Sequence, residues 1–169
     1  GPYNIKVDGV AESIMIDDIY FGDVYFCSGQ SNMAFLMSNE LYNRDEKEEF
    51  PLIRQLFVYR KTAVTPQKDV SNAEWKVTER SNFRRLSAVA YYFAKSIYQQ
   101  EEIPIGIIHS SWGGSPIETF MSPASLTDFE EATGKVEKIT PEFIENTRKA
   151  NEQLLKENPG VSNPKGFVN

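Results

Sequence analysis

Two short segments of the sequence hold residue types that perform acyl transfer. Residues 29–33 read Gly-Gln-Ser-Asn-Met, and residues 112–114 read Trp-Gly-Gly. A serine at a sharp turn after a strand exposes its hydroxyl and directs backbone N–H groups toward an oxyanion, and paired glycines let another N–H come close. Each segment alone is more typical of a plain turn or a helix cap. The hypothesis that Ser31 is a nucleophile therefore depends on both segments lying together.

Three apolar runs are typical of buried strands and would position these segments: residues 24–27, 51–58 and 103–108. Between the second and third runs, apolar residues at positions 86, 89, 90, 93, 94 and 97 share one face of a predicted helix. We interpret residues 61–84 as a long connection. Strand, connection, helix and strand in this order indicate an α/β sheet, whose ligands bind beyond the carboxyl ends of the strands. Both segments follow such ends.

The flanking regions carry weaker signals. Residues 3–7 and 14–16 alternate in polarity, which predicts two half-buried strands at the edge of an antiparallel unit. The charged residues 39–50 are interpreted as solvated helix or loop, and a short helix is expected from residue 117 to about residue 126. A last helix should begin with Thr140 as N-cap and Pro141 at its first position, and end before Asn158. The tail, residues 161–169, shows no pattern.

Composition narrows the class of protein. The 169 residues, 40% hydrophobic and 25% charged, suffice for one globular domain or one domain and part of another. Lys and Arg number 18 against 24 Asp and Glu, and the net charge of -6 argues against nucleic-acid binding. No apolar run approaches the roughly 20 residues of a membrane span. One Cys and one His exclude an intrachain disulfide and a zinc site built from such residues.

The two segments with their flanks, residues 22–33 and 104–118, resemble the sialate O-acetylesterases of the SGNH hydrolase superfamily. The resemblance covers roughly residues 20–126, including the predicted helix. It implies an α/β fold of three layers, with a flavodoxin-like parallel sheet and flanking helices. Residues 1–20 would then end a preceding β unit, and residues 21–169 would form the N-terminal part of the esterase domain.

The resemblance also implies residue roles. Ser31 matches the nucleophile, which becomes acetylated before water releases acetate. The oxyanion hole would use the N–H of Ser31 and that of a glycine in the second segment. Gly114 is the favoured glycine, and Gly113 stays open as the alternative. Gln30, Asn32 and Trp112 would line the substrate site. No metal or organic cofactor is implied, because acyl transfer by serine, base and oxyanion hole needs none.

Two elements of the family pattern are absent from this sequence: the Trp-Tyr-Gln-Gly-Glu-x-Asn segment and the Asp-x-x-His that supplies the base. Loss of a triad member lowers turnover by roughly 10⁴ to 10⁶, so we expect an incomplete esterase domain with little or no activity. His109 could form a Ser–His dyad with Ser31, although a structural role is favoured. Asp23 is interpreted as a capping group rather than an orienting carboxylate, and Cys27 as a small core residue.

The leading hypothesis is a carbohydrate O-acetylesterase that acts on sialic acid or related glycans, so the expected partner is an acetylated sugar. Acetylxylan-type esterases share the Gly-Gln-Ser-Asn-Met segment and are one alternative. A noncatalytic carbohydrate-binding or assembly domain is another. An exposed strand edge could pair with a second copy. The resemblance implies a periplasmic or secreted, extracytoplasmic location.

Overall fold

The computed structural model describes residues 1–42, 49–63, 65–70 and 73–158, apart from the side chains of Ala132 and Val136. A central sheet of four strands carries the rest of the fold, in the spatial order β3 (Asp23–Gly29), β6 (Ile105–Ser111), β4 (Phe50–Phe57) and β5 (Trp75–Thr78). The first three strands are parallel, and β5 runs antiparallel to β4. The predicted strands and the α/β class are confirmed.

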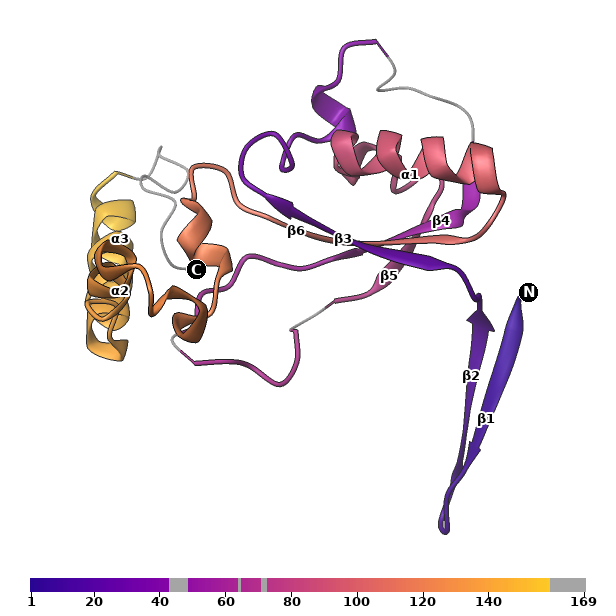
Figure 1. Cartoon of the computed structure of the whole chain (residues 1–169), viewed down its shortest axis with the longest axis horizontal. Helices are drawn as coiled ribbons and strands as arrows, with labels where there is room; N and C mark the ends of the chain where they lie inside the picture. Colours follow the sequence, from indigo (N-terminus) through magenta and orange to yellow (C-terminus); the bar gives the residue numbers. More distant parts are fainter. Residues whose placement is uncertain (43–48, 64, 71–72, 159–169) are drawn as a thin grey trace.

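Two strands at the N-terminus form a separate hairpin, as predicted, but the expected half-burial is wrong, because every residue of the two strands except Ile19 is exposed. β1 (Tyr3–Asp8) pairs antiparallel with β2 (Ser13–Ile19), and the hairpin projects away from the central sheet (Figure 1). The Arg54 side chain of β4 joins the two units, because its guanidinium donates to the Asp18 backbone oxygen and to the Asp18 carboxylate, each at 2.9 Å.

Helix α1 (Ala88–Glu101) covers one face of the central sheet (Figure 1). Ser87 caps its start by accepting a hydrogen bond from the Ala90 N–H. Ala90 and Ala94 are buried against strand side chains that include Ile53, Ile105 and Ile107. Because alanine adds almost no side-chain bulk, the helix can lie close to the sheet and bury these isoleucines completely.

The buried sector of α1 differs from the predicted stripe. Val89 and Phe93 are 48% and 43% exposed, whereas Tyr91 is fully buried. The reason is a second apolar cluster beside the helix, in which Tyr91 packs edge to face on Phe83 at 5.0 Å. The cluster includes residues of two single turns, η1 (Met37–Asn39) and η2 (Phe83–Arg85). The buried side of α1 therefore faces these turns as well as the sheet.

The opposite face of the sheet is uncovered in the part of the chain that the structure describes. Val24 and Phe26 of β3 are 60% and 68% exposed there. Helices α2 (Glu130–Val136) and α3 (Pro141–Glu157) lie beyond the end of the sheet and not over this face (Figure 1). The described residues therefore form two layers where three were expected. The pairing of the free β3 edge with a second copy stays a prediction.

Two further predictions from the sequence need correction, and one helix was missed. The connection at 61–84 contains β5, which at four residues is too short for its alternation to be decisive. The helix expected at 117–126 is split into η3 (Ile117–Phe120) and η4 (Pro123–Leu126), because Pro123 cannot continue a helix and the preceding Ser122 is extended. Helix α2 was not predicted.

The start of α3 is confirmed: the Thr140 hydroxyl accepts from the Phe143 N–H at 3.1 Å, and Pro141 occupies the first turn. Residues 161–169, and positions 43–48 of the charged stretch, lie outside the described residues. Within the described ranges no helix is long and apolar enough to cross a membrane.

The second apolar cluster predicts a stability difference between two methionines. Met37 is completely buried, whereas Met15 in the hairpin is 54% exposed. Truncation of a fully buried Met to Ala costs about 2 to 5 kcal/mol through lost burial and the cavity left behind. Met37→Ala should therefore lower the free energy of unfolding in urea by that amount, and Met15→Ala should change it by less than about 1 kcal/mol. Equal losses in both variants would contradict the cluster.

Candidate active site

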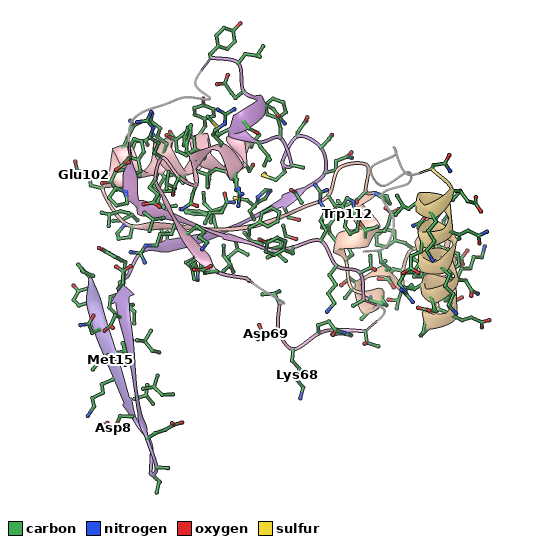
Figure 2. All side chains as sticks on the ribbon, turned by 180° about the vertical axis from the view of Figure 1, so that it is seen from behind. Asp8, Met15, Lys68, Asp69, Glu102 and Trp112 are labelled. Carbon is green, nitrogen blue, oxygen red and sulfur yellow. The ribbon has the colours of Figure 1, made fainter. Side chains whose placement is uncertain are left out.

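The two candidate segments, residues 29–33 and 112–114, meet at the carboxyl edge of the sheet. β3 and β6 pair in parallel with Gly29 opposite Ser111, so the loops that follow these strands begin side by side. The Trp112 N–H donates a hydrogen bond to the Gly29 carbonyl at 3.0 Å and ties the two loops together. Figure 2 shows Trp112 where the chain leaves the sheet, at the end opposite Glu102, the C-cap of α1.

The backbone of Gly113 lies directly against Ser31. A Cβ atom on Gly113 would lie 3.6 Å from the Ser31 Cα and 4.0 Å from the Ser31 backbone nitrogen. A Cβ on Gly114, the glycine favoured from the sequence, would contact nothing within 4 Å, and its φ of +80° suits glycine. The structure thus brings Gly113, more closely than Gly114, to Ser31.

Three backbone N–H groups of the two loops have no acceptor in the described part of the chain. Within the described residues, the N–H groups of Ser31, Gly113 and Gly114 donate to no protein acceptor. All three residues are exposed, so their N–H groups are open to an incoming oxygen atom. Backbone N–H donors that have no acceptor and lie in the two loops beside a serine hydroxyl are groups that could stabilise the oxyanion of acyl transfer.

The turn that presents Ser31 is anchored to the start of α1. The Ala34 N–H donates to the Gln30 carbonyl at 2.9 Å and closes the turn. The Ser87 hydroxyl donates to the Met33 sulfur at 3.4 Å. The Ala88 N–H, at the first position of α1, donates to the Phe35 carbonyl at 2.8 Å. These contacts connect the serine turn to the buried helix.

His109 is fully buried on the α1 side of β6. Its Nε2 lies 2.7 Å from the Ser111 hydroxyl oxygen, and its ring packs edge to face on Phe57 at 5.2 Å. Among the described residues, no hydrogen bond joins it to the Ser31 hydroxyl. The arrangement favours the structural role over the Ser–His dyad, since His109 holds Ser111 at the end of β6.

Burial sets the protonation state of His109. It holds the pKa of the imidazole below the ordinary value of 6.5, and the positive charge of Arg60 acts in the same direction. The backbone of Met33 opposes this shift without reversing it. His109 is therefore neutral at neutral pH.

The other residues singled out from the sequence are distributed as follows. Gln30 and Asn32 are exposed on either side of Ser31, and Trp112 is half-buried beside it in the neighbouring loop. Asp23 lies at the start of β3, at the end of the strand away from Ser31, where its carboxylate accepts a hydrogen bond from the Tyr25 hydroxyl at 3.3 Å. It is therefore not placed to orient a base at the serine.

Cys27 is a core residue, as expected. It is buried among the apolar side chains beneath α1, and burial raises the pKa of its thiol. A thiol with a raised pKa is a weak nucleophile. In the described part of the chain, no cluster of three or more His, Cys, Asp and Glu side chains could hold a metal ion.

Sequence reasoning missed Arg60 as a residue of this edge. Its Nε donates to the Ser111 carbonyl at 3.3 Å, and its guanidinium lies 5.8 Å from the centre of the Trp112 ring. The signal was available, because the chain after a third parallel strand must emerge at the same edge as the loops of β3 and β6.

The buried imidazole predicts a pH dependence of stability. The folded state resists protonation of His109, so near and below pH 6.5 the unfolded chain binds more protons at this residue than the folded chain does, at most one more. The free energy of unfolding should fall as the pH is lowered from 7.5 to 5.5, by at most about 1.4 kcal/mol per pH unit. His109→Gln should remove this slope, since the sequence has one His. Urea denaturation across this pH range measures it, and parallel slopes for both proteins would contradict the account.

Comparison with known proteins identifies the family of the chain. Residues 21–154 match the family described as carbohydrate esterase, sialic acid-specific acetylesterase. The sialate O-acetylesterases of Pongo abelii and Homo sapiens are each 34% identical to the chain over 143 residues, which cover 75% of this chain and 27% of theirs. The chain thus spans about a quarter of the length of these relatives.

A solved structure of a carbohydrate esterase also matches the chain. The crystal structure of a carbohydrate acetylesterase from Xanthomonas citri superposes with a TM-score of 0.69 and 33% sequence identity. The match covers 76% of this chain and 30% of that one. The resemblance read from the two loop segments is therefore confirmed at the level of the family, and the chain belongs to the sialic acid-specific acetylesterase family of carbohydrate esterases.

Proposed function

We propose that this chain carries the nucleophile of a carbohydrate O-acetylesterase, with Ser31 as the attacking residue. The observation that carries the proposal is the contact between Gly113 and Ser31, with unoccupied N–H donors on both sides of it. A plain turn does not need a second loop to approach its serine so closely. Family membership adds support from the names of the relatives, which are sialate O-acetylesterases.

The reaction follows from these groups. The Ser31 Oγ attacks the carbonyl carbon of the acetyl ester, and its proton passes to a base. In this proposal, the negative charge that develops on the carbonyl oxygen is stabilised by the N–H groups of Ser31 and Gly113, which have no acceptor within the described residues. The sugar hydroxyl leaves with a proton, and water then hydrolyses acetyl-Ser31 to release acetate.

The base is the part of this mechanism that the described residues do not supply. The Nε2 of His109 already interacts with the Ser111 hydroxyl, and the ring is buried. We propose that the base comes from an Asp-x-x-His segment outside this sequence, as the family resemblance implies. The 169-residue chain alone should then be nearly inactive, and tests of catalysis need the protein at its full natural length.

The proposed substrate is an O-acetylated sialic acid or a related glycan. The exposed amides of Gln30 and Asn32 flank Ser31, and the Trp112 ring lies in the facing loop. Amides and an aromatic ring suit the hydroxyls and the apolar face of a sugar. Acetylxylan is the alternative substrate. Because such glycans are met outside the cytoplasm, we propose a periplasmic or secreted location.

Replacement of the nucleophile tests the proposed reaction. In the full-length protein, Ser31→Ala should lower the rate of acetate release from 9-O-acetylated sialic acid by about 10⁴ or more, because the acetyl group has no acceptor on the enzyme. Ser81→Ala is the matched control. Ser81 is exposed and its hydroxyl donates to the Glu79 carboxylate, away from the carboxyl edge.

Each other outcome has a definite meaning. If Ser31→Ala retains the wild-type rate, another residue is the nucleophile and the proposal is wrong. If the wild-type protein releases no acetate but binds the sugar, it is a noncatalytic carbohydrate-binding domain. Release from acetylated xylan in preference to acetylated sialic acid would replace the proposed substrate and leave the role of Ser31 intact.

A further inference from the structure

We propose that Arg60 binds the carboxylate of an acidic sugar and thereby selects acetylated sialic acid over neutral acetylated sugars. The inference rests on the proposed function and concerns the same site. Sialic acids carry a carboxylate that neutral sugars such as xylose lack. A cation fixed at the same edge of the sheet as the nucleophile would distinguish the two classes of substrate.

The position of Arg60 follows from strand pairing. β4 pairs in parallel with β6 and places Phe57 opposite His109. The Val58 N–H continues this ladder by donating to the His109 carbonyl at 2.9 Å. Arg60 is two residues further along, so it emerges beside the loop that carries Trp112. Three parallel strands thus contribute to one edge, and the third supplies a cation.

The side chain of Arg60 is held in place from two sides. Its Nε donates to the Ser111 carbonyl at 3.3 Å, and the guanidinium lies over the Trp112 ring at 5.8 Å. Nε makes the one hydrogen bond of this side chain among the described residues, and there the terminal nitrogens Nη1 and Nη2 have no hydrogen-bond acceptor. Two parallel N–H groups on a guanidinium are the fork that binds a carboxylate in bidentate fashion.

The charge of Arg60 is not balanced by the protein. The chain has a net charge of -6, yet in the described ranges no carboxylate forms an ion pair with Arg60. The positive charge of Arg60 acts on its neighbour His109, because it helps to hold the pKa of that imidazole below its ordinary value. An exposed, oriented and unpaired cation next to the loop of Gly113 is available to an anionic group of the substrate.

A binding measurement tests this role without requiring catalysis. The full-length protein would be titrated calorimetrically with N-acetylneuraminic acid and with its methyl ester, which has the same ring but no charge. We expect the acid to bind about ten- to a hundredfold more tightly than the ester, as for a hydrogen-bonded charge pair. Arg60→Gln should bind the two ligands equally, and Arg60→Lys, which keeps the charge and loses the fork, should fall between.

Arg80→Gln is the matched control. Arg80 is exposed and follows β5, whose Thr78 pairs with Phe50 at the start of β4, so it lies at the other end of the sheet. This variant should keep the wild-type preference for the acid. If Arg60 serves only to tether the loop through Ser111, Arg60→Gln will weaken both ligands by the same factor, and the proposal is overturned.

The remaining outcomes are also decisive. A wild-type protein that binds acid and ester equally, or that binds neither, overturns the proposal, as does a preference that survives in Arg60→Gln. The proposed function fails by a different result, an unchanged rate of acetate release in Ser31→Ala. The two results could also occur together. If the preference for the acid depends on Arg60 but Ser31→Ala releases acetate at the wild-type rate, the carboxylate-binding role of Arg60 holds and the assignment of Ser31 as the nucleophile is wrong.

Discussion

Parallel hydrogen bonding between β3 and β6 sets the distance between the two loops that could perform chemistry. Because Gly29 stands opposite Ser111, the chains leave the sheet at the same level, and the Trp112 N–H is left to donate to the Gly29 carbonyl. A shift of the register by even one residue would move one loop by about 3.3 Å along the strand and separate Gly113 from Ser31. The contact at the candidate site is thus a consequence of backbone pairing.

Burial of apolar side chains in the core also fixes the register between β3 and β6. Ile105 and Ile107 of β6 are buried beneath the alanines of α1. A shift of β6 by one residue would expose these isoleucines and turn the side chains of the opposite face of the strand into the core. The first turn of α1 holds the serine loop through Ser87 and Met33. At the end of β6, the buried His109 fixes the Ser111 hydroxyl. Ser31 is therefore exposed to solvent and yet attached to the most buried part of the molecule.

The sequence was sufficient for the elements with strong local signals. The apolar runs of β3, β4 and β6 and the helical spacing in α1 located the core, and their order placed both loop segments at one edge. Tyr91 could not be assigned to the core in advance, because its burial depends on Phe83 from a distant turn. Gly113 and Gly114 are equivalent as residue types, and only the path of the backbone separates them. Arg60 belongs to no recognisable sequence motif, and only its position after β4 brings it to the candidate site.

The central claim is that the N–H groups of Ser31 and Gly113 together form an oxyanion hole around a Ser31 nucleophile. The most direct measurement is a crystal structure of the full-length protein after reaction with an organophosphonate, whose phosphoryl oxygen occupies the place of the oxyanion. The account predicts a covalent bond to the Ser31 Oγ and a phosphoryl oxygen within about 3 Å of both backbone nitrogens. Attachment to another residue, or an oxygen that faces away from Gly113, would contradict it.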